Sequence, residues 1–294
     1  MEKILSLQDF VEAAAAQGMS FGAYALKAQA VELEIGESEL AGQMFECVEV
    51  MRAAARSGLR GQKTRGGLAG GDAQKIFRAR AQKSYINITG DIVSDAIQTA
   101  LAIGEANASM GKIVAAPTAG ASGVIPGVLF ALEKPLGLDD AAIGKGLVVA
   151  GVIGLVIASR ASLSGAVGGC QAECGSAAAM AAGAAADLAG GEPAVIAHAS
   201  AIAMKAMLGL ICDPVAGLVE VPCIKRNAAA AVVALTAAQM ALAGIKSFIP
   251  ADEVFDAMKS VGASLPPSLK ETSAGGIAQA PTALAWAKEH LHAD

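Results

Sequence analysis

The sequence is poor in aromatic and in charged residues. Aromatic side chains make up 3% of its 294 residues and charged ones 17%, whereas hydrophobic residues reach 54% and glycine occurs 34 times. Because the apolar content is mainly alanine, valine, leucine and isoleucine, helices can approach one another closely. The composition predicts an all-α protein of many Ala- and Gly-rich helices around a buried central helix, with active-site loops between the helices.

Long basic runs are absent as well, and the net charge is −5. A nucleic acid is therefore not an expected partner. The N-terminal sequence MEKILSLQDF lacks the basic and apolar regions of a signal peptide. We expect a cytoplasmic protein, in which cysteines stay reduced and are available as ligands or nucleophiles.

Hydrophobic runs long enough to cross a membrane are scarce, although the mean hydropathy is +0.51. The strongest run, at 147–158, has only twelve residues before Ser159, too few to span the hydrocarbon core. Residues 228–245 are mostly alanine and include Thr236 and Gln239. We expect both segments to be helices buried on all sides of a soluble core and no membrane association.

Helical periodicity with capping residues covers most of the chain. Strand-like alternation is scarce, and no internal repeat or linker occurs. We expect one domain over 1–294, with residues 1–57 as a helical part packed on it. The expected helices follow Ser6 and Ser20, run from a cap at Ser38 to Gly58 and from a cap at Thr89 to near Gly111, and cover 122–133, 139–158, 175–189, 193–210, 227–243, 251–261 and 281–290.

The breaks between these helices are polar and rich in glycine, which is unusual in so apolar a chain. Exposed amides in such loops, close to helix N-termini, bind anions such as carboxylates. We favour a binding role over ordinary loops for 115–127 and 264–276, and weigh the two equally for 57–73. The breaks lie at 57–73, 115–127, 161–175, 209–227 and 264–276.

Five cysteines occur, and none of them forms a CxxC pair or a Cys/His zinc pattern. Cys47 lies on the apolar face of an expected helix and is expected to pack in the core. Cys170, Cys212 and Cys223 all lie at junctions bounded by glycine or proline, where backbone turns could aim several thiolates at one point. Spacing alone nevertheless favours buried or incidental thiols over a metal site.

Four sequence segments shift the balance from incidental thiols toward a metal site. SGAVGGCQAECGSAAAMAA (164–182), CDPVAGLVEVPCIKRNA (212–228), APTAGASGVIPGVL (116–129) and KETSAGG (270–276) together resemble the bacterial iron–sulfur-dependent L-serine dehydratases, and specifically the alpha chain of the two-chain type. The resemblance implies a [4Fe–4S] cluster held by Cys170, Cys212 and Cys223. It does not place Cys174 among the ligands.

The implied chemistry needs no pyridoxal phosphate. A cluster held by three thiolates leaves one iron open to substrate oxygen, and a Lewis acid assists departure of the hydroxyl of L-serine. The product aminoacrylate then yields pyruvate and ammonia.

The alternative for the polar loops is helix capping without a ligand. We expect Lys270 to join these loops in holding the substrate carboxylate, with the other substrate-binding candidates being Thr118, Gly120, Ser122, Thr272 and Ser273.

A general base is not evident in the sequence. His198 falls in an Ala-rich helix, where a packed histidine is the favoured interpretation, and His290 and His292 fall in a terminal segment. Glu173 and Lys270 are the catalytic candidates within this chain. The resemblance implies that a separate beta subunit supplies the rest of the active site, so we expect a heteromeric, oligomeric enzyme.

Two other functions are compatible with the same residues. One is cysteine desulfidase activity, which is the same elimination with a thiol leaving group. The other is a cluster-carrying subunit without a substrate of its own. The carboxylate-binding character of 115–127 and 264–276 argues against the second, since electron transfer has no use for such loops.

Overall fold

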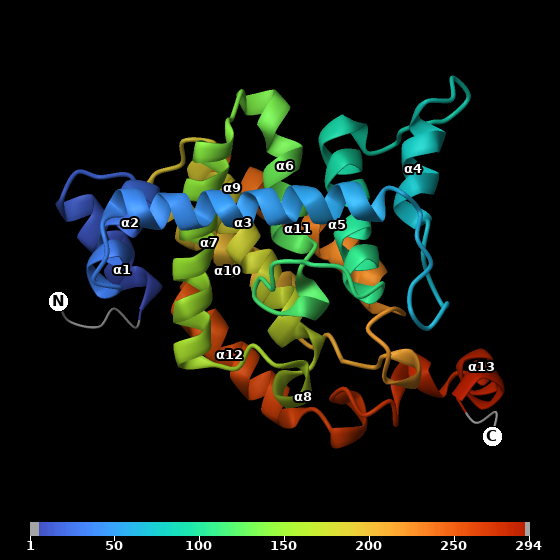
Figure 1. The fold of residues 1–294 in the computed structure, drawn as a ribbon. Helices are drawn as coiled ribbons and strands as arrows, with labels where there is room; N and C mark the ends of the chain where they lie inside the picture. Colours follow the sequence, from blue (N-terminus) through green and yellow to red (C-terminus); the bar gives the residue numbers. More distant parts are fainter. Residues whose placement is uncertain (1–5, 292–294) are drawn as a thin grey trace.

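The computed structural model describes residues 6–291, which form a helical fold (Figure 1). These residues contain thirteen α-helices and no β-strand, so the predicted all-α class is confirmed. The helices are α1 (Leu7–Ala16), α2 (Phe21–Glu32), α3 (Glu37–Gly58), α4 (Asp72–Arg80), α5 (Gly90–Ala108), α6 (Val124–Leu136), α7 (Asp140–Arg160), α8 (Gly165–Gly168), α9 (Ser176–Leu188), α10 (Pro193–Met207), α11 (Cys223–Leu242), α12 (Ala251–Ser264) and α13 (Pro281–Leu291).

Short helical turns lie in the loops. Four of them are 3₁₀ turns and one, directly before α9, is a π-helical turn. They are η1 (Ala119–Ala121), η2 (Gln171–Gly175, the π-helical turn), η3 (Val215–Gly217), η4 (Pro267–Leu269) and η5 (Gly276–Gln279). A π-helical turn is a frequent feature of functional sites.

Helix starts follow the predicted caps in part. Ser6 and Ser20 cap α1 and α2, because each hydroxyl accepts a hydrogen bond from the amide three residues later. The cap predicted at Ser38 is wrong, since α3 already begins at Glu37 after Gly36. Acidic residues in the first turn of α3 suit the positive end of the helix dipole without a side-chain cap.

Two helices were not predicted, and a third starts earlier than predicted. Helix α4 buries only Ala73, so it has no apolar stripe for periodicity to reveal. Helix α8 has four residues, too few to show a period. Helix α11 begins at Cys223 instead of Asn227, which places a candidate ligand in its first turn.

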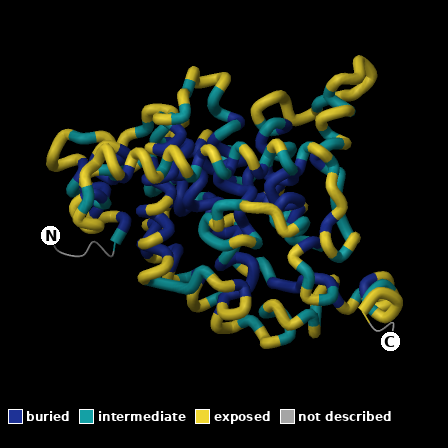
Figure 2. The backbone as a smooth tube through the Cα atoms, viewed as in Figure 1, coloured by how far each residue is buried: buried dark blue, intermediate teal, exposed yellow. Residues whose placement is uncertain are grey.

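The central helix is α9, which packs against α6, α7, α10 and α11. Residues 176–186 of this helix are all buried, and most of them are alanine (Figure 2). Small side chains let neighbouring helices approach closely. A Cβ added at Gly183, for example, would lie 2.3 Å from the Cδ1 atom of Ile153.

Helices α7 and α11, which contain the two long apolar segments, pack against α9, and each keeps one side exposed to solvent. Leu155 of α7 is 56% exposed, and Thr236 and Gln239 of α11 are also exposed. The prediction that both are buried on all sides is therefore wrong, because only the all-small α9 occupies the centre. Helix α7 has the length and hydropathy of a membrane span, but 67% of its most apolar window is buried inside the fold.

Helices α1–α3 pack on the remaining helices. Helix α1 contacts α10 and α12, α2 contacts α7, and α3 lies across α5 and α7 (Figure 1). The loops that matter for function gather where α6, α9 and α11 begin. There, η1 contacts both η2 and α11, and η2 contacts α11. The fold therefore brings three sequence-distant loops to one end of the central helices.

Candidate functional site

Three cysteines from three different segments face one region. Cys170 directly precedes the π-helical turn η2, Cys212 lies in the extended segment after α10, and Cys223 is the first residue of α11. Cys170 is 3% exposed and Cys212 is 4% exposed. Burial is the main cause that raises the pKa of Cys212 and that of Cys223, the latter to about 12, and a charge on Cys170 contributes to both increases. A charge on Cys223 also raises the pKa of Cys212. All three thiols therefore lie within range of one another's charge.

The spacing of these thiols does not suit a single metal ion. Within residues 6–291, no group of three cysteine, histidine, aspartate or glutamate side chains is close enough to hold one ion. A cubane cluster differs because its own iron and sulfide atoms fill the space between the thiolates. Three mutually interacting thiols with no single-ion geometry therefore fit a cluster better than an ion. Their role as ligands stays a prediction.

The other two cysteines differ from each other. The thiol of Cys174 hydrogen-bonds with Cys170, and that bond together with the nearby charge of Arg226 lowers the pKa of Cys170 despite its burial. Cys174 therefore lies closer to the three thiols than the sequence suggested. Cys47 is half-buried on α3 and packs against the core, as predicted.

Residues 269–271 hold Cys212 through its backbone. The amide of Cys212 donates to the carbonyl of Leu269 at 2.9 Å, and the amide of Glu271 donates to the carbonyl of Cys212 at 2.7 Å. These contacts pair Lys270 with Cys212 in an isolated parallel β-bridge. The loop at 264–276 and the cysteine segment are therefore neighbours, as the two motifs together suggested.

Strained backbone marks this junction. Ala216, Glu271 and Ser273 have φ angles of 55°, 63° and 55°, in the left-handed region that non-glycine residues seldom occupy. Such strain persists where surrounding contacts enforce it, and it clusters at functional sites.

Two of the hydroxyls proposed for substrate binding are already engaged within the protein. Ser273 donates to the carbonyl of Pro214 at 2.6 Å and accepts from the amide of Gly217 at 2.9 Å. Thr272 donates to the carbonyl of Pro267 at 3.0 Å. Both side chains fix the shape of the loops, so neither hydroxyl is free to donate to a ligand in this arrangement.

Glu173 lies between two glycine-bearing loops and Cys212. A Cβ added at Gly165 would lie 2.8 Å from Glu173 Oε2 and 3.1 Å from Cys212 Sγ, and one at Gly120 would lie 3.4 Å from Glu173 Oε1. The glycines thus allow the carboxyl group to approach the thiol. Burial raises the pKa of Glu173, and the charge of Glu271 raises it further.

Two hydroxyls of the 115–127 loop lack hydrogen-bond partners. Thr118 Oγ1 and Ser122 Oγ are buried without a hydrogen-bond partner among residues 6–291. The Thr118 hydroxyl is close enough to lower the pKa of Glu173 without reaching hydrogen-bond geometry. A buried hydroxyl without a partner costs free energy. Both atoms therefore keep unused hydrogen-bonding capacity in one polar loop.

Asn227 ties this loop to the cysteine helix. Its Nδ2 donates to the carbonyls of Gly120 (2.6 Å) and Cys223 (2.9 Å), and its Oδ1 accepts from the amide of Gly123 at 2.8 Å. The sequence interpretation did not select this residue. A buried amide directly after the cysteine motif of an apolar chain was the signal that could have identified it.

Gln171 performs a similar role next to Cys170. Its Nε2 donates to the carbonyls of Gly168 and Met258, and its Oε1 accepts from the amide of Gly209. Because this side chain is fully buried and fully bonded, it fixes η2 against α12 and against the end of α10.

The Gly-rich loop at 57–73 is held by buried carboxylates. Glu220 accepts hydrogen bonds from the amides of Gly66 (2.6 Å) and Leu68 (2.9 Å) and from the hydroxyl of Thr64. Glu105 accepts from the amide of Asp72 at 2.6 Å. These amides already bind carboxylates of the protein, so the structure favours an anchoring role for this loop over anion binding.

The described histidines lie outside the site. His198 is on α10, nine residues before Met207, which contacts Gly175 near the thiols; this is about 13 Å along the helix. Burial and two nearby lysines lower the pKa of His198. His290 is exposed and stacks on Trp286, whereas His292 lies outside the described residues.

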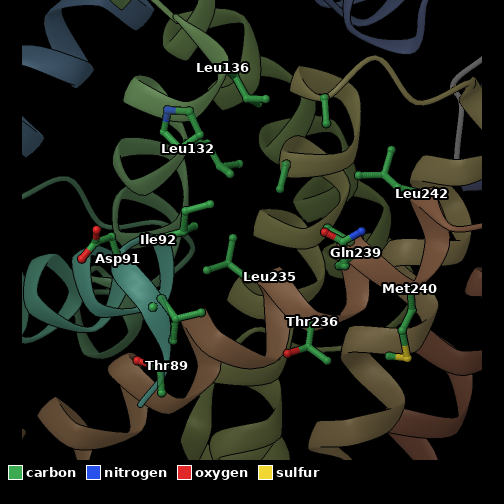
Figure 3. Close-up of a pocket in the computed structure, with 16 residues that line it drawn as sticks. Thr89, Asp91, Ile92, Leu132, Leu136, Leu235, Thr236, Gln239, Met240 and Leu242 are labelled. Atoms are coloured by element: carbon green, nitrogen blue, oxygen red, sulfur yellow. The ribbon is translucent and has the colours of Figure 1, made fainter. Parts of the chain in front are cut away.

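A separate pocket of about 580 Å³ lies at the opposite ends of the same helices (Figure 3). Leu235 and Leu242 of α11 face Ile92 of α5 and Leu132 of α6 across it. Leu235 is twelve residues from Cys223, or about 18 Å along the helix. The lining is mostly apolar and contains no thiol, so the chemically equipped site is the one around the cysteines.

Comparison with known proteins identifies the relatives of this chain. A family model for the serine dehydratase alpha chain matches residues 6–278. The probable L-serine dehydratase alpha chain of Bacillus subtilis is 50% identical over 86% of this chain and 85% of its own length. The L-serine dehydratase alpha chain of Peptoniphilus asaccharolyticus is 43% identical over 84% of each chain. The L-serine dehydratase of Streptomyces coelicolor is 42% identical over 82% of this chain and 54% of its own length.

Two polar side chains at the 118–123 loop, Asn227 and Ser122, should differ in how much they contribute to stability. Asn227→Ala removes three hydrogen bonds to buried groups, and should lower the free energy of unfolding of the metal-free chain by about 2–4 kcal/mol in urea titrations. Ser122→Ala removes a hydroxyl without a described partner, so its free energy of unfolding should stay within about 1 kcal/mol of that of the unmodified chain. Thr236→Ala on the exposed side of α11 is the control. A Ser122→Ala chain as unstable as Asn227→Ala would contradict the assignment of a free hydroxyl.

Proposed function

The chain belongs to the serine dehydratase alpha-chain family, and from that membership we propose that it is the alpha subunit of an L-serine dehydratase, converting L-serine to pyruvate and ammonia. One observation carries the proposal beyond the family. Three thiols, those of Cys170 and Cys212 buried and that of Cys223 half-buried, lie beside the half-buried carboxyl group of Glu173 and close to a loop with two unpartnered hydroxyls.

Cys170, Cys212 and Cys223 would hold a [4Fe–4S] cluster. When bound, the cluster would supply a Lewis acid for the departing hydroxyl of serine, which is otherwise a poor leaving group. No pyridoxal phosphate is part of the proposal. The chain's own contribution is to bury these thiols, so that water is kept from the ligands.

The loop at 115–127 would bind the substrate carboxylate. Thr118 Oγ1 and Ser122 Oγ are free to donate, and the backbone at Gly120 approaches the site without a side chain in the way. Lys270, which forms a β-bridge with Cys212 through its backbone, would add a positive charge. Thr272 and Ser273 would act by shaping the loop, since their hydroxyls are engaged elsewhere.

Glu173 is the proton-handling group that this chain would contribute. Its raised pKa follows from burial and from Glu271, and its carboxyl group lies next to Cys212. The main base would come from a beta subunit. The lack of a described histidine beside the thiols supports this division, as do relatives whose names call them alpha chains. A cytoplasmic, oligomeric enzyme completes the proposal.

The first test of this function is turnover with and without the second subunit. With the cluster assembled anaerobically, the chain alone should form little pyruvate from L-serine, because the base is missing. Adding a separately produced beta chain should restore turnover. L-Cysteine assayed in parallel distinguishes the desulfidase alternative, which predicts the higher kcat/KM for L-cysteine. Full turnover by the isolated chain would contradict the shared site and assign the base to Glu173 or Lys270.

The proposed ligand set predicts that two cysteine variants will bind different amounts of iron. Cys212→Ser should lose most of the iron bound after anaerobic assembly, because a serine hydroxyl is a poor replacement for a thiolate. Cys174→Ser, adjacent to Cys170 but outside the proposed set, should keep the iron content of the unmodified chain. Iron and acid-labile sulfide per chain are the measurements. Equal iron in the unmodified chain and in Cys212→Ser would refute the ligand assignment.

The proposed carboxylate loop predicts a kinetic effect for Ser122→Ala. The variant should load its cluster normally and fold normally, but the KM for L-serine should rise by about tenfold or turnover should fall, since one donor to the substrate is lost. Steady-state kinetics of the assembled enzyme measure this effect, with Thr236→Ala as the control. Unchanged kinetics would remove the hydroxyl from the binding site.

A further inference from the structure

One side chain reaches all three cysteine segments. Arg226 belongs to α11, three residues after Cys223. Its Nη1 donates to the carbonyl of Ile211 at 2.9 Å, and its Nη2 lies 2.8 Å from Oδ1 of Asp213. Its guanidinium group also lies close enough to Cys170 for its positive charge to lower the pKa of that thiol. The contacts therefore involve both chain neighbours of Cys212, as well as Cys170 itself.

The carboxylate of Asp213 aims this guanidinium. Asp213 is 1% exposed, and its second oxygen, Oδ2, accepts a hydrogen bond from the amide of Ile277 at 2.8 Å. Asp213 therefore cannot turn away from Arg226 without breaking a contact with η5. The guanidinium is only partly exposed, with 19% of the side chain accessible, so its planar fork is held in one orientation.

The electrostatic surroundings favour a cation at this place. Glu173 and Glu271 lie close enough to act on the thiols, and the three thiols repel one another when charged. Arg226 is the positively charged group that acts on Cys170 and Cys223. Thiolates bound to a cluster would add negative charge to this region, and a fixed guanidinium offsets part of it.

We propose that Arg226 is a positioning residue for the cluster: it clamps the segments of Cys170, Cys212 and Cys223 into one arrangement and donates an N–H to the Cys170 sulfur. This inference rests on the proposed cluster-bearing function. Only arginine has a rigid fork that can contact a carbonyl, a carboxylate and a sulfur at the same time. Lysine keeps the charge but has a single donor group on a flexible stem.

The alternative is a purely structural ion pair that joins α11 to residues 211–213. Such a pair would affect folding but would not change the electronic properties of a bound cluster. Hydrogen bonds to cluster sulfurs, in contrast, help to set its reduction potential. A spectroscopic signature and a potential therefore separate the two roles.

The experiment compares Arg226→Gln and Arg226→Lys with Lys225→Gln, whose parent side chain is 65% exposed and pairs with Asp72. Hydrogen exchange of the metal-free chains is measured first. In Arg226→Gln, the amides of Cys212 and Glu271 should exchange about tenfold faster, because residues 211–213 lose their tether. Lys225→Gln should leave both amides unchanged. Unchanged exchange in Arg226→Gln would overturn the clamp, whether or not a cluster forms.

The loaded chains are then compared after anaerobic assembly. Arg226→Gln should lose iron to a chelator about tenfold faster than the unmodified chain, and its midpoint potential should shift downward because a donor and a positive charge are gone. Arg226→Lys should also lose iron faster but should show the smaller shift in potential. Arg226→Gln with unchanged retention, electron paramagnetic resonance spectrum and potential would overturn the inference. The iron content of the unmodified chain, measured in the same series, tests the proposed function separately.

Discussion

Three thiols must be held together although Cys170 is distant in the sequence from Cys212 and Cys223 and although the three repel one another when charged. The structure meets this constraint with hydrogen bonds that each join two elements. Gln171 fixes the segment of Cys170, the backbone at Leu269 and Glu271 fixes Cys212, and Asn227 fixes the start of α11. The side chains of Gln171 and Asn227 are buried, so breaking any of their hydrogen bonds leaves buried groups unsatisfied.

The helix packing supplies the platform for these contacts. Because α9 consists mainly of alanine, α6, α7, α10 and α11 can surround it closely, and the starts of α6, α9 and α11 meet at one end. The loops there carry the glycines that admit Glu173 to the thiols. The mostly apolar pocket at the opposite ends of these helices contains no thiol.

The sequence predicted the helical class, most helix positions and the three junction cysteines, because periodicity, capping and motif resemblance are local signals. It could not predict partners separated by a hundred residues, such as Asn227 with Gly120 or Glu220 with Gly66. For the same reason Ser273 was chosen for its hydroxyl, which the fold uses to join two loops. Helix α4 was missed because it buries almost nothing, and α7 was misjudged because hydropathy does not show which side faces a neighbour.

The central claim is that this chain binds one cubane cluster through three thiols. The most direct measurement is the iron and acid-labile sulfide content of the purified chain after anaerobic assembly, combined with Mössbauer spectra recorded with and without L-serine. The account predicts about four irons and about four sulfides per chain, with one iron whose signal changes when serine is added. A folded chain that binds a single iron without sulfide, or a full cluster in which no iron responds to serine, would contradict it.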